Sequence, residues 1–94
     1  MMHLEMDKKI VGGKYVKVEL DVENGAIKNA LISGDFFAFP IEEFEKFLNA
    51  LKGIKFNVEE IENIFEQYAK KIVFSGIGIN DLKEIFLLLL KEMA

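Results

Sequence analysis

The pattern of hydrophobic and polar positions divides the chain into a strand-rich first third and a helical remainder. Apolar and charged residues alternate over residues 16–22, a period of two that is typical of a β-strand with one buried face. Asn24-Gly25 then favours a tight hairpin turn, and residues 26–33 return as the partner strand. A shorter strand over residues 8–11 precedes the Gly12-Gly13 turn, so we expect an antiparallel sheet of two or three strands.

Three amphipathic helices are predicted after Pro40, because apolar residues recur there at helical spacing. Asn57 and Asn80 are expected to cap the second and third helices, and Gly53 fits the position just past the first. Residues 75–78 are expected to form a loop. The predicted buried positions are Ile41, Phe44, Phe47, Leu48, Leu51, Ile61, Ile64, Phe65, Tyr68, Ile72, Leu82, Ile85, Phe86, Leu89, Leu90 and Met93.

The third predicted helix is apolar on more than one side, because Leu87 and Leu88 fill positions outside its main stripe. A helix that is apolar all round is normally buried, yet a domain of 94 residues can hardly enclose a terminal helix. We therefore expect part of this helix to contact a partner or a second copy of the chain.

The segment Ile-Ser-Gly-Asp-Phe-Phe-Ala-Phe-Pro at residues 32–40 is the most unusual part of the sequence. Gly34 permits backbone conformations that side chains forbid, and Asp35 suits either a turn or a helix N-cap. Phe36, Phe37 and Phe39 carry more apolar area than a short turn needs. The segment therefore either fills the core or presents a surface to another protein.

Composition narrows the possible functions. The chain has 94 residues, 51% of them hydrophobic and 30% charged, which predicts one globular domain over residues 1–94. The net charge of −4, with lysine as the only basic residue besides one histidine, gives no support to nucleic-acid binding. Cysteine is absent, which excludes disulfides and thiol chemistry. The longest apolar run, residues 85–90, is too short to cross a membrane, and no signal peptide is visible, so we expect a cytoplasmic protein without a membrane partner.

Candidates for catalysis or metal binding are few, and we expect neither in this chain. His3 is the only histidine and is expected in a frayed terminus, and no histidine lies near Ser33 or Ser75 in sequence. Gly12-Gly13-Lys14 resembles a phosphate-binding loop in composition but lacks the spacing of a Walker motif. It is either a tight turn or a device that directs Lys14 toward an anion held by a partner.

Taken in order, several of these motifs resemble the accessory domain of lipoate–protein ligases over nearly the whole chain. That domain is the C-terminal part of many bacterial ligases and a separate small subunit in some archaea. The resemblance implies an α+β fold in two layers, with a small antiparallel sheet packed on three helices, similar to the scaffold proteins of the NifU and SufE type. The motifs that carry it are Gly12-Gly13-Lys14, the alternating valines at 16 and 18, Asn24-Gly25, Gly34-Asp35-Phe36-Phe37, Leu51-Lys52-Gly53 and residues 77–82.

The resemblance also implies a function. The chain would be a non-catalytic accessory subunit that a separate catalytic subunit needs for ATP-dependent activation of lipoate to lipoyl-adenylate, before transfer to a lysine of lipoyl domains. ATP and lipoate would bind through the catalytic subunit, and no cofactor to this chain alone. Residues Gly12, Gly13 and Lys14 would reach the phosphates or a partner loop, while Gly34, Asp35, Phe36, Phe37, Leu87 and Leu88 would dock the partner. The alternative is a stand-alone interaction module that homodimerises through its last helix.

Overall fold

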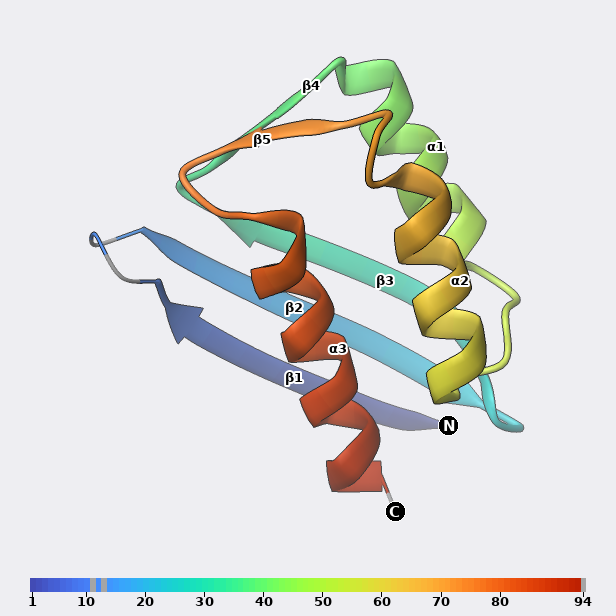
Figure 1. Cartoon of the computed structure of the whole chain (residues 1–94). Coiled ribbons are helices and arrows are strands. Elements are labelled where there is room, and N and C mark those ends of the chain that lie inside the picture. The colour runs from blue at the N-terminus through green and yellow to red at the C-terminus, as the bar shows by residue number, and fades with distance from the viewer. Residues whose placement is uncertain (11, 13, 94) are drawn as a thin grey trace.

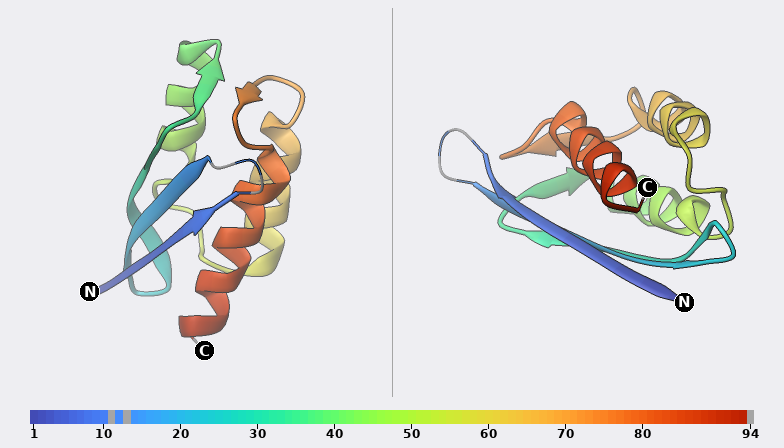
Figure 2. Two further views of the ribbon diagram at one scale, coloured as in Figure 1. Left: turned by 90° about the vertical axis from the view of Figure 1, so that its left-hand side faces the viewer. Right: turned by 90° about the horizontal axis from the view of Figure 1, so that it is seen from below.

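The computed structural model, which describes residues 1–10, 12 and 14–93, has two layers. An antiparallel sheet forms one layer, and three helices cover one of its faces (Figures 1 and 2). The expected α+β fold is therefore confirmed. The elements in chain order are β1 (Met2–Lys9), β2 (Tyr15–Glu23), β3 (Ala26–Gly34), β4 (Phe37–Phe39), α1 (Ile41–Leu51), α2 (Val58–Tyr68), β5 (Val73–Ser75) and α3 (Ile79–Met93).

The main sheet has the strand order β1-β2-β3, with both neighbouring pairs antiparallel. The prediction of a short first strand over residues 8–11 was wrong: β1 begins at residue 2 and pairs with β2 along its whole length. Leu4 lies opposite Leu20 and Met6 opposite Val18, so the apolar alternation of β1 continues the buried face of β2. Val11, the last residue of the predicted strand, lies outside the described residues.

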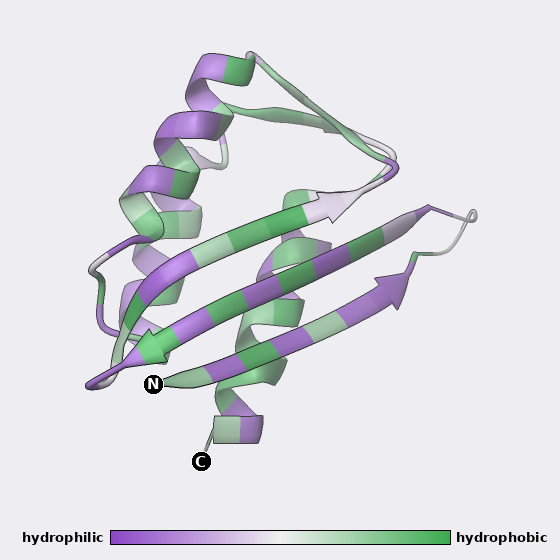
Figure 3. Ribbon diagram, turned by 180° about the vertical axis from the view of Figure 1, so that it is seen from behind, coloured by the Kyte–Doolittle hydropathy of each residue, from purple (hydrophilic) through white to green (hydrophobic). Residues whose placement is uncertain are grey.

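The β2–β3 hairpin is confirmed. Asn24 and Gly25 both have positive φ, 53° and 76°, as a tight hairpin turn requires. Viewed from the side that carries no helices, the strands show alternating hydrophilic and hydrophobic residues (Figure 3). One face of the sheet is therefore buried under the helices, and the other is polar and open.

Two of the three predicted helix-boundary residues, Gly53 and Asn57, are confirmed. Gly53 comes directly after Lys52, the C-cap of α1. The Asn57 side chain accepts a hydrogen bond from the Glu60 N–H at 2.8 Å, which confirms it as the N-cap of α2. Asn80, however, lies inside α3 and does not cap it. Gly78 takes that place, since its carbonyl accepts from the Asp81 N–H and the Asp81 carboxylate accepts from the Gly78 N–H at 2.8 Å. The acidic side chain three residues into the helix thus selects an earlier start.

A second, two-stranded ribbon was not predicted. Strands β4 and β5 pair antiparallel, with Ala38 opposite Phe74 and Phe39 opposite Val73. Residue 75 therefore ends a strand, and only residues 76–78 of the predicted loop connect it to α3. The ribbon lies above α2 and α3 in Figure 1, next to the start of α1.

The core lies between the main sheet and the three helices. Phe65 of α2 joins the helices, with its ring centroid 5.2 Å from that of Phe47 and 5.2 Å from that of Phe86. Most predicted buried positions are buried, but Ile41 is 53% exposed. Leu48, Leu90 and Met93 are only partly buried at the edge of the core.

Candidate functional site

Three chain connections meet at one end of the main sheet, on the left of Figure 1: the β1–β2 loop, the β3–β4 corner and the β5–α3 loop. A methyl group in place of a Gly76 hydrogen would lie 3.3 Å from Cγ of Lys14 and 3.5 Å from the Asp35 carbonyl oxygen. We call this region the glycine corner. It comprises Gly12, Lys14, Gly34, Asp35 and Gly76, while the neighbouring Gly13 lies outside the described residues.

Lys14 is exposed, and hydrogen bonds fix the backbone that follows its Cα. Its carbonyl accepts from the Ile10 N–H at 2.6 Å, which closes the β1–β2 connection. The next residue, Tyr15, donates its N–H to the Asp35 carboxylate, and its carbonyl accepts from the Asp35 N–H at 3.1 Å. The turn interpretation of Asp35 is therefore correct and the cap interpretation is wrong, since Pro40 occupies the N-cap position of α1.

Gly34 is required by the backbone. Its φ is +150°, and a methyl group there would lie 2.1 Å from the Tyr15 carbonyl oxygen. No side chain fits between these strands, so local geometry alone explains a glycine at this position. Docking by Gly34 stays a prediction.

The phenylalanines of the 32–40 segment divide between core and surface. Phe36 points inward and packs edge-on against Phe44 at 6.2 Å. Phe37 is 66% exposed and stacks on Phe39, with 6.2 Å between the ring centroids. The exposed Val73 lies opposite Phe39 on β5 and Ile41 follows at the start of α1. We call Phe37, Phe39, Ile41 and Val73 the outer ribbon patch.

The sequence analysis singled out two members of this patch, Phe37 and Phe39, and assigned only Phe37 to docking. Val73 belongs to it through the pairing of β4 with β5, and that pairing joins residues more than thirty positions apart. Ile41 was assigned to the core because it starts the helical repeat. The alternation of a strand, applied to residues 36–39, would have separated the inward Phe36 from the outward Phe37 and Phe39.

The two leucines predicted for partner contact on α3 are both half-buried. Leu87 packs against the core, and both leucines line an open groove of about 680 Å³. The groove is lined by Phe56, Asn57, Val58, Glu84, Leu87, Leu88, Leu90, Lys91 and Met93. This part of α3 thus reaches the surface, and a partner there stays a prediction.

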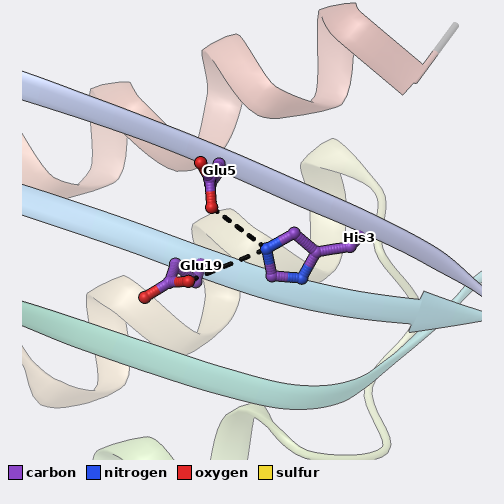
Figure 4. Close-up of side chains that lie close together, drawn as sticks. All are labelled: His3, Glu5 and Glu19. Carbon is purple, nitrogen blue, oxygen red and sulfur yellow. Dashed lines mark hydrogen bonds and ion pairs between the residues drawn. The ribbon is translucent and has the colours of Figure 1, made fainter.

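A polar cluster occupies the open face of the sheet (Figure 4). The prediction that His3 lies in a frayed terminus was wrong. Its Nδ1 lies 2.8 Å from the Asp21 carboxylate, and its Nε2 lies 3.1 Å from Glu5 and 3.7 Å from Glu19. The hydrogen bond to Asp21, followed by that to Glu5, raises the pKa of His3, and the same bond lowers the pKa of Asp21. The imidazolium form donates to two carboxylates at once, so the cluster ties β1 to β2 in a pH-dependent way.

The same cluster is the place where described side chains come close enough to share a cation. One ligand atom each from His3, Glu5 and Glu19 lies within 4.8 Å of the others. The sequence did not indicate this grouping, because its members come from two strands. His3 and Glu5 are both half exposed, and the ion pairs within the cluster account for the arrangement without a metal.

The comparisons with known proteins agree with one another. A profile of the family described as "Bacterial lipoate protein ligase C-terminus" matches residues 1–86. Lipoate-protein ligase A subunit 2 of Thermoplasma acidophilum is 30% identical over 82 residues, which cover 85% of this chain and 85% of that protein.

In the described part of the chain, the helices are too short or too polar to span a membrane.

A solved structure is also similar to this chain. It comes from a study of an archaeal lipoylation system, a bipartite lipoate protein ligase and its E2 lipoyl domain from Thermoplasma acidophilum. The TM-score is 0.71 at 28% sequence identity, and the match covers 90% of this chain and 97% of the solved one. The likeness therefore extends over the whole two-layer fold.

Proposed function

The chain belongs to the family of bacterial lipoate protein ligase C-terminal domains, as its motifs predicted, and we propose that it is the small accessory subunit of a two-chain lipoate–protein ligase. The match over residues 1–86 carries this proposal. The similar Thermoplasma proteins support the two-chain arrangement, since one is named as subunit 2 and the other belongs to a bipartite ligase. The catalytic subunit is the partner, and lipoyl-domain proteins are the acceptors.

The chemistry has two steps. In the first, a carboxylate oxygen of lipoate attacks the α-phosphorus of ATP, which forms lipoyl-adenylate and releases pyrophosphate. In the second, a lysine amine of the lipoyl domain attacks the acyl carbon and releases AMP. The first step concentrates negative charge on phosphate oxygens, so it gains from fixed positive groups and from exclusion of water. We assign the small subunit to this first step, with ATP and lipoate held by the catalytic subunit.

Lys14 is the residue that we propose for the phosphates. A lysine ammonium is a point charge suited to phosphate oxygens, and the chain contains no arginine that would do the same. Lys14 is exposed at the glycine corner, where three chain connections meet. This setting lets a partner's bound nucleotide approach closely.

The outer ribbon patch is the surface that we propose for docking the catalytic subunit. Phe37, Phe39, Ile41 and Val73 are each more than half exposed, so covering them removes large apolar side chains from water. The patch directly follows the glycine corner in the chain, because Asp35 precedes Phe37 by two residues. One partner surface can therefore cover the patch and present its nucleotide to Lys14.

The basic test measures both half-reactions with purified chains. We expect pyrophosphate release from ATP and lipoate only when both chains are present, while the catalytic subunit alone transfers the acyl group from preformed lipoyl-adenylate. Rapid pyrophosphate release by the catalytic subunit alone would contradict the accessory role. Release by the small chain alone would contradict its non-catalytic nature.

Lys14→Ala tests the residue assignment within the assembled complex. Loss of one charge at the phosphates should lower the rate of adenylate formation by about 10- to 100-fold, below the loss from removing an oxyanion-hole donor. Transfer from preformed lipoyl-adenylate should be nearly unchanged. Lys52→Ala is the matched control, because Lys52 is exposed just after α1 on the other side of the molecule (Figure 1). Lys14→Ala should still co-elute with the catalytic subunit, and loss of co-elution would instead assign Lys14 to assembly.

A second candidate function is a stand-alone module that homodimerises through α3. The apolar groove beside Leu88 favours it, since such a groove is a usual place for a helix of a second copy. Light scattering of the purified chain separates the two functions. A dimer that Leu88→Glu converts to a monomer would support this second candidate.

A further inference from the structure

Three separate connections of the fold meet around Lys14. The β1–β2 loop holds its carbonyl through the Ile10 N–H, and the β3–β4 corner holds the next residue through the paired hydrogen bonds of Asp35 with Tyr15. The β5–α3 loop touches the side chain itself. A methyl group at Gly76 would lie 3.3 Å from Cγ and 3.5 Å from Cδ of Lys14, so the lysine stem occupies the space over this glycine.

We infer that Gly76 is a positioning residue for Lys14, an inference that rests on the proposed role of Lys14 in adenylate formation. Gly76 has a φ of +98°, a conformation that residues with side chains rarely adopt, and its missing Cβ leaves room for the lysine stem. A side chain at this position displaces the stem. Because the stem is confined before the nucleotide arrives, less rotamer freedom is lost when the ammonium meets a phosphate.

The direct test is Gly76→Ala in the complex with the catalytic subunit. The added methyl forces Cγ of Lys14 to move by a few tenths of an ångström. We expect about a tenfold loss in the rate of adenylate formation, less than the 100-fold that a 1 Å misplacement can cause. Transfer from preformed lipoyl-adenylate should be unchanged. Gly76→Asn serves as a second variant in case alanine prevents folding, since asparagine tolerates positive φ.

Gly53→Ala is the matched control for backbone strain. Gly53 has a φ of +93°, close to that of Gly76, but a methyl group there would have no neighbour within 4 Å. It therefore reproduces the conformational strain without touching Lys14. Thermal unfolding of both variants shows whether they are folded at the assay temperature. A loss for Gly76→Ala no greater than that for Gly53→Ala would overturn the inference.

A double-mutant cycle separates positioning of Lys14 from a general structural effect. In the Lys14→Ala background, Gly76→Ala should cause no further loss of adenylate formation, because the side chain that it displaces is gone. Equal losses in both backgrounds would overturn the inference. If Lys14→Ala alone has no effect, the roles of Lys14 and of Gly76 both fail. The accessory function is tested separately, by whether adenylate formation requires the small chain.

Discussion

Replacement of Gly34 by alanine should destabilise the domain strongly, because two independent costs meet at this residue. The backbone has a φ of +150°, and a residue with a side chain held in such a sparsely populated region costs about 1–3 kcal/mol. The methyl would also lie 2.1 Å from the Tyr15 carbonyl oxygen and 3.0 Å from Cα of Val16. Non-bonded heavy atoms essentially never come closer than 3.0 Å to a real Cβ atom, so β2 and β3 must shift apart.

The magnitude follows from adding these costs. Overpacking of a tight site costs about 1–3 kcal/mol, so the free energy of unfolding should fall by about 2–6 kcal/mol in all. For a domain of this size each kcal/mol lowers Tm by about 4–8 °C, which gives a fall of at least about 8 °C. Because the stability of a whole domain is about 5–15 kcal/mol, the upper end of this range would leave little folded protein.

The assay is urea and thermal unfolding of Gly34→Ala beside Gly53→Ala. The control shares the positive φ but has open space around the new methyl, so it isolates the backbone cost of about 1–2 kcal/mol. Gly34→Ala should be clearly less stable than Gly53→Ala. Equal destabilisation would refute the clash with Tyr15 and would reopen a direct docking role for Gly34. If the reasoning holds, a complex that contains folded Gly34→Ala keeps both half-reactions.

Two further predictions concern the open sheet face and the partner surface. The folded-state pKa of His3 is raised, so its contribution to stability is complete below its unfolded pKa of about 6.5 and disappears as pH rises through the folded pKa. The pKa of Asp21 is lowered, so its contribution to stability is lost only in acid. The Tm of the parent chain should therefore exceed that of His3→Gln most at about pH 5–6 and least at about pH 8. A difference in Tm that does not depend on pH would contradict this prediction. Phe37→Glu should keep the fold and abolish co-elution with the catalytic subunit, because a charge trapped in an interface is costly. Leu88→Glu should leave co-elution intact, and the opposite pair of results would move docking to α3.

The fold could be predicted where apolar positions keep one regular period over a whole strand or helix, because one face of that element is buried. Residues 16–22 and the three helices have apolar positions at a single period, and the hairpin turn has its own sequence signal. The early start of β1 was missed because Leu4 is the only buried residue in its alternation. The β4–β5 ribbon was missed because three residues are too few to show a period, and its pairing spans the whole helical pair α1–α2.

The candidate site was predictable only in its local part. Lys14, Gly34 and Asp35 stand out because glycine and aspartate have special backbone roles that a sequence displays. The contact between Gly76 and Lys14 joins a residue that precedes α1 and α2 in the chain to one that follows them, so the sequence alone does not indicate it. The position of His3 opposite Asp21 likewise depends on the register of β1 against β2.

The arrangement of the two surfaces favours one mode of assembly over the other. The outer ribbon patch and the glycine corner lie at the same end of the molecule, because the β3–β4 corner leads directly into β4 (Figure 1). The groove on α3 involves residues 84–93, in the half of that helix that runs away from the corner. In the proposed assembly, a catalytic subunit docked on the patch would bring its nucleotide to the end of the molecule that carries Lys14, whereas one docked in the groove would leave Lys14 without a role. Docking and phosphate contact thus support each other only at the ribbon end.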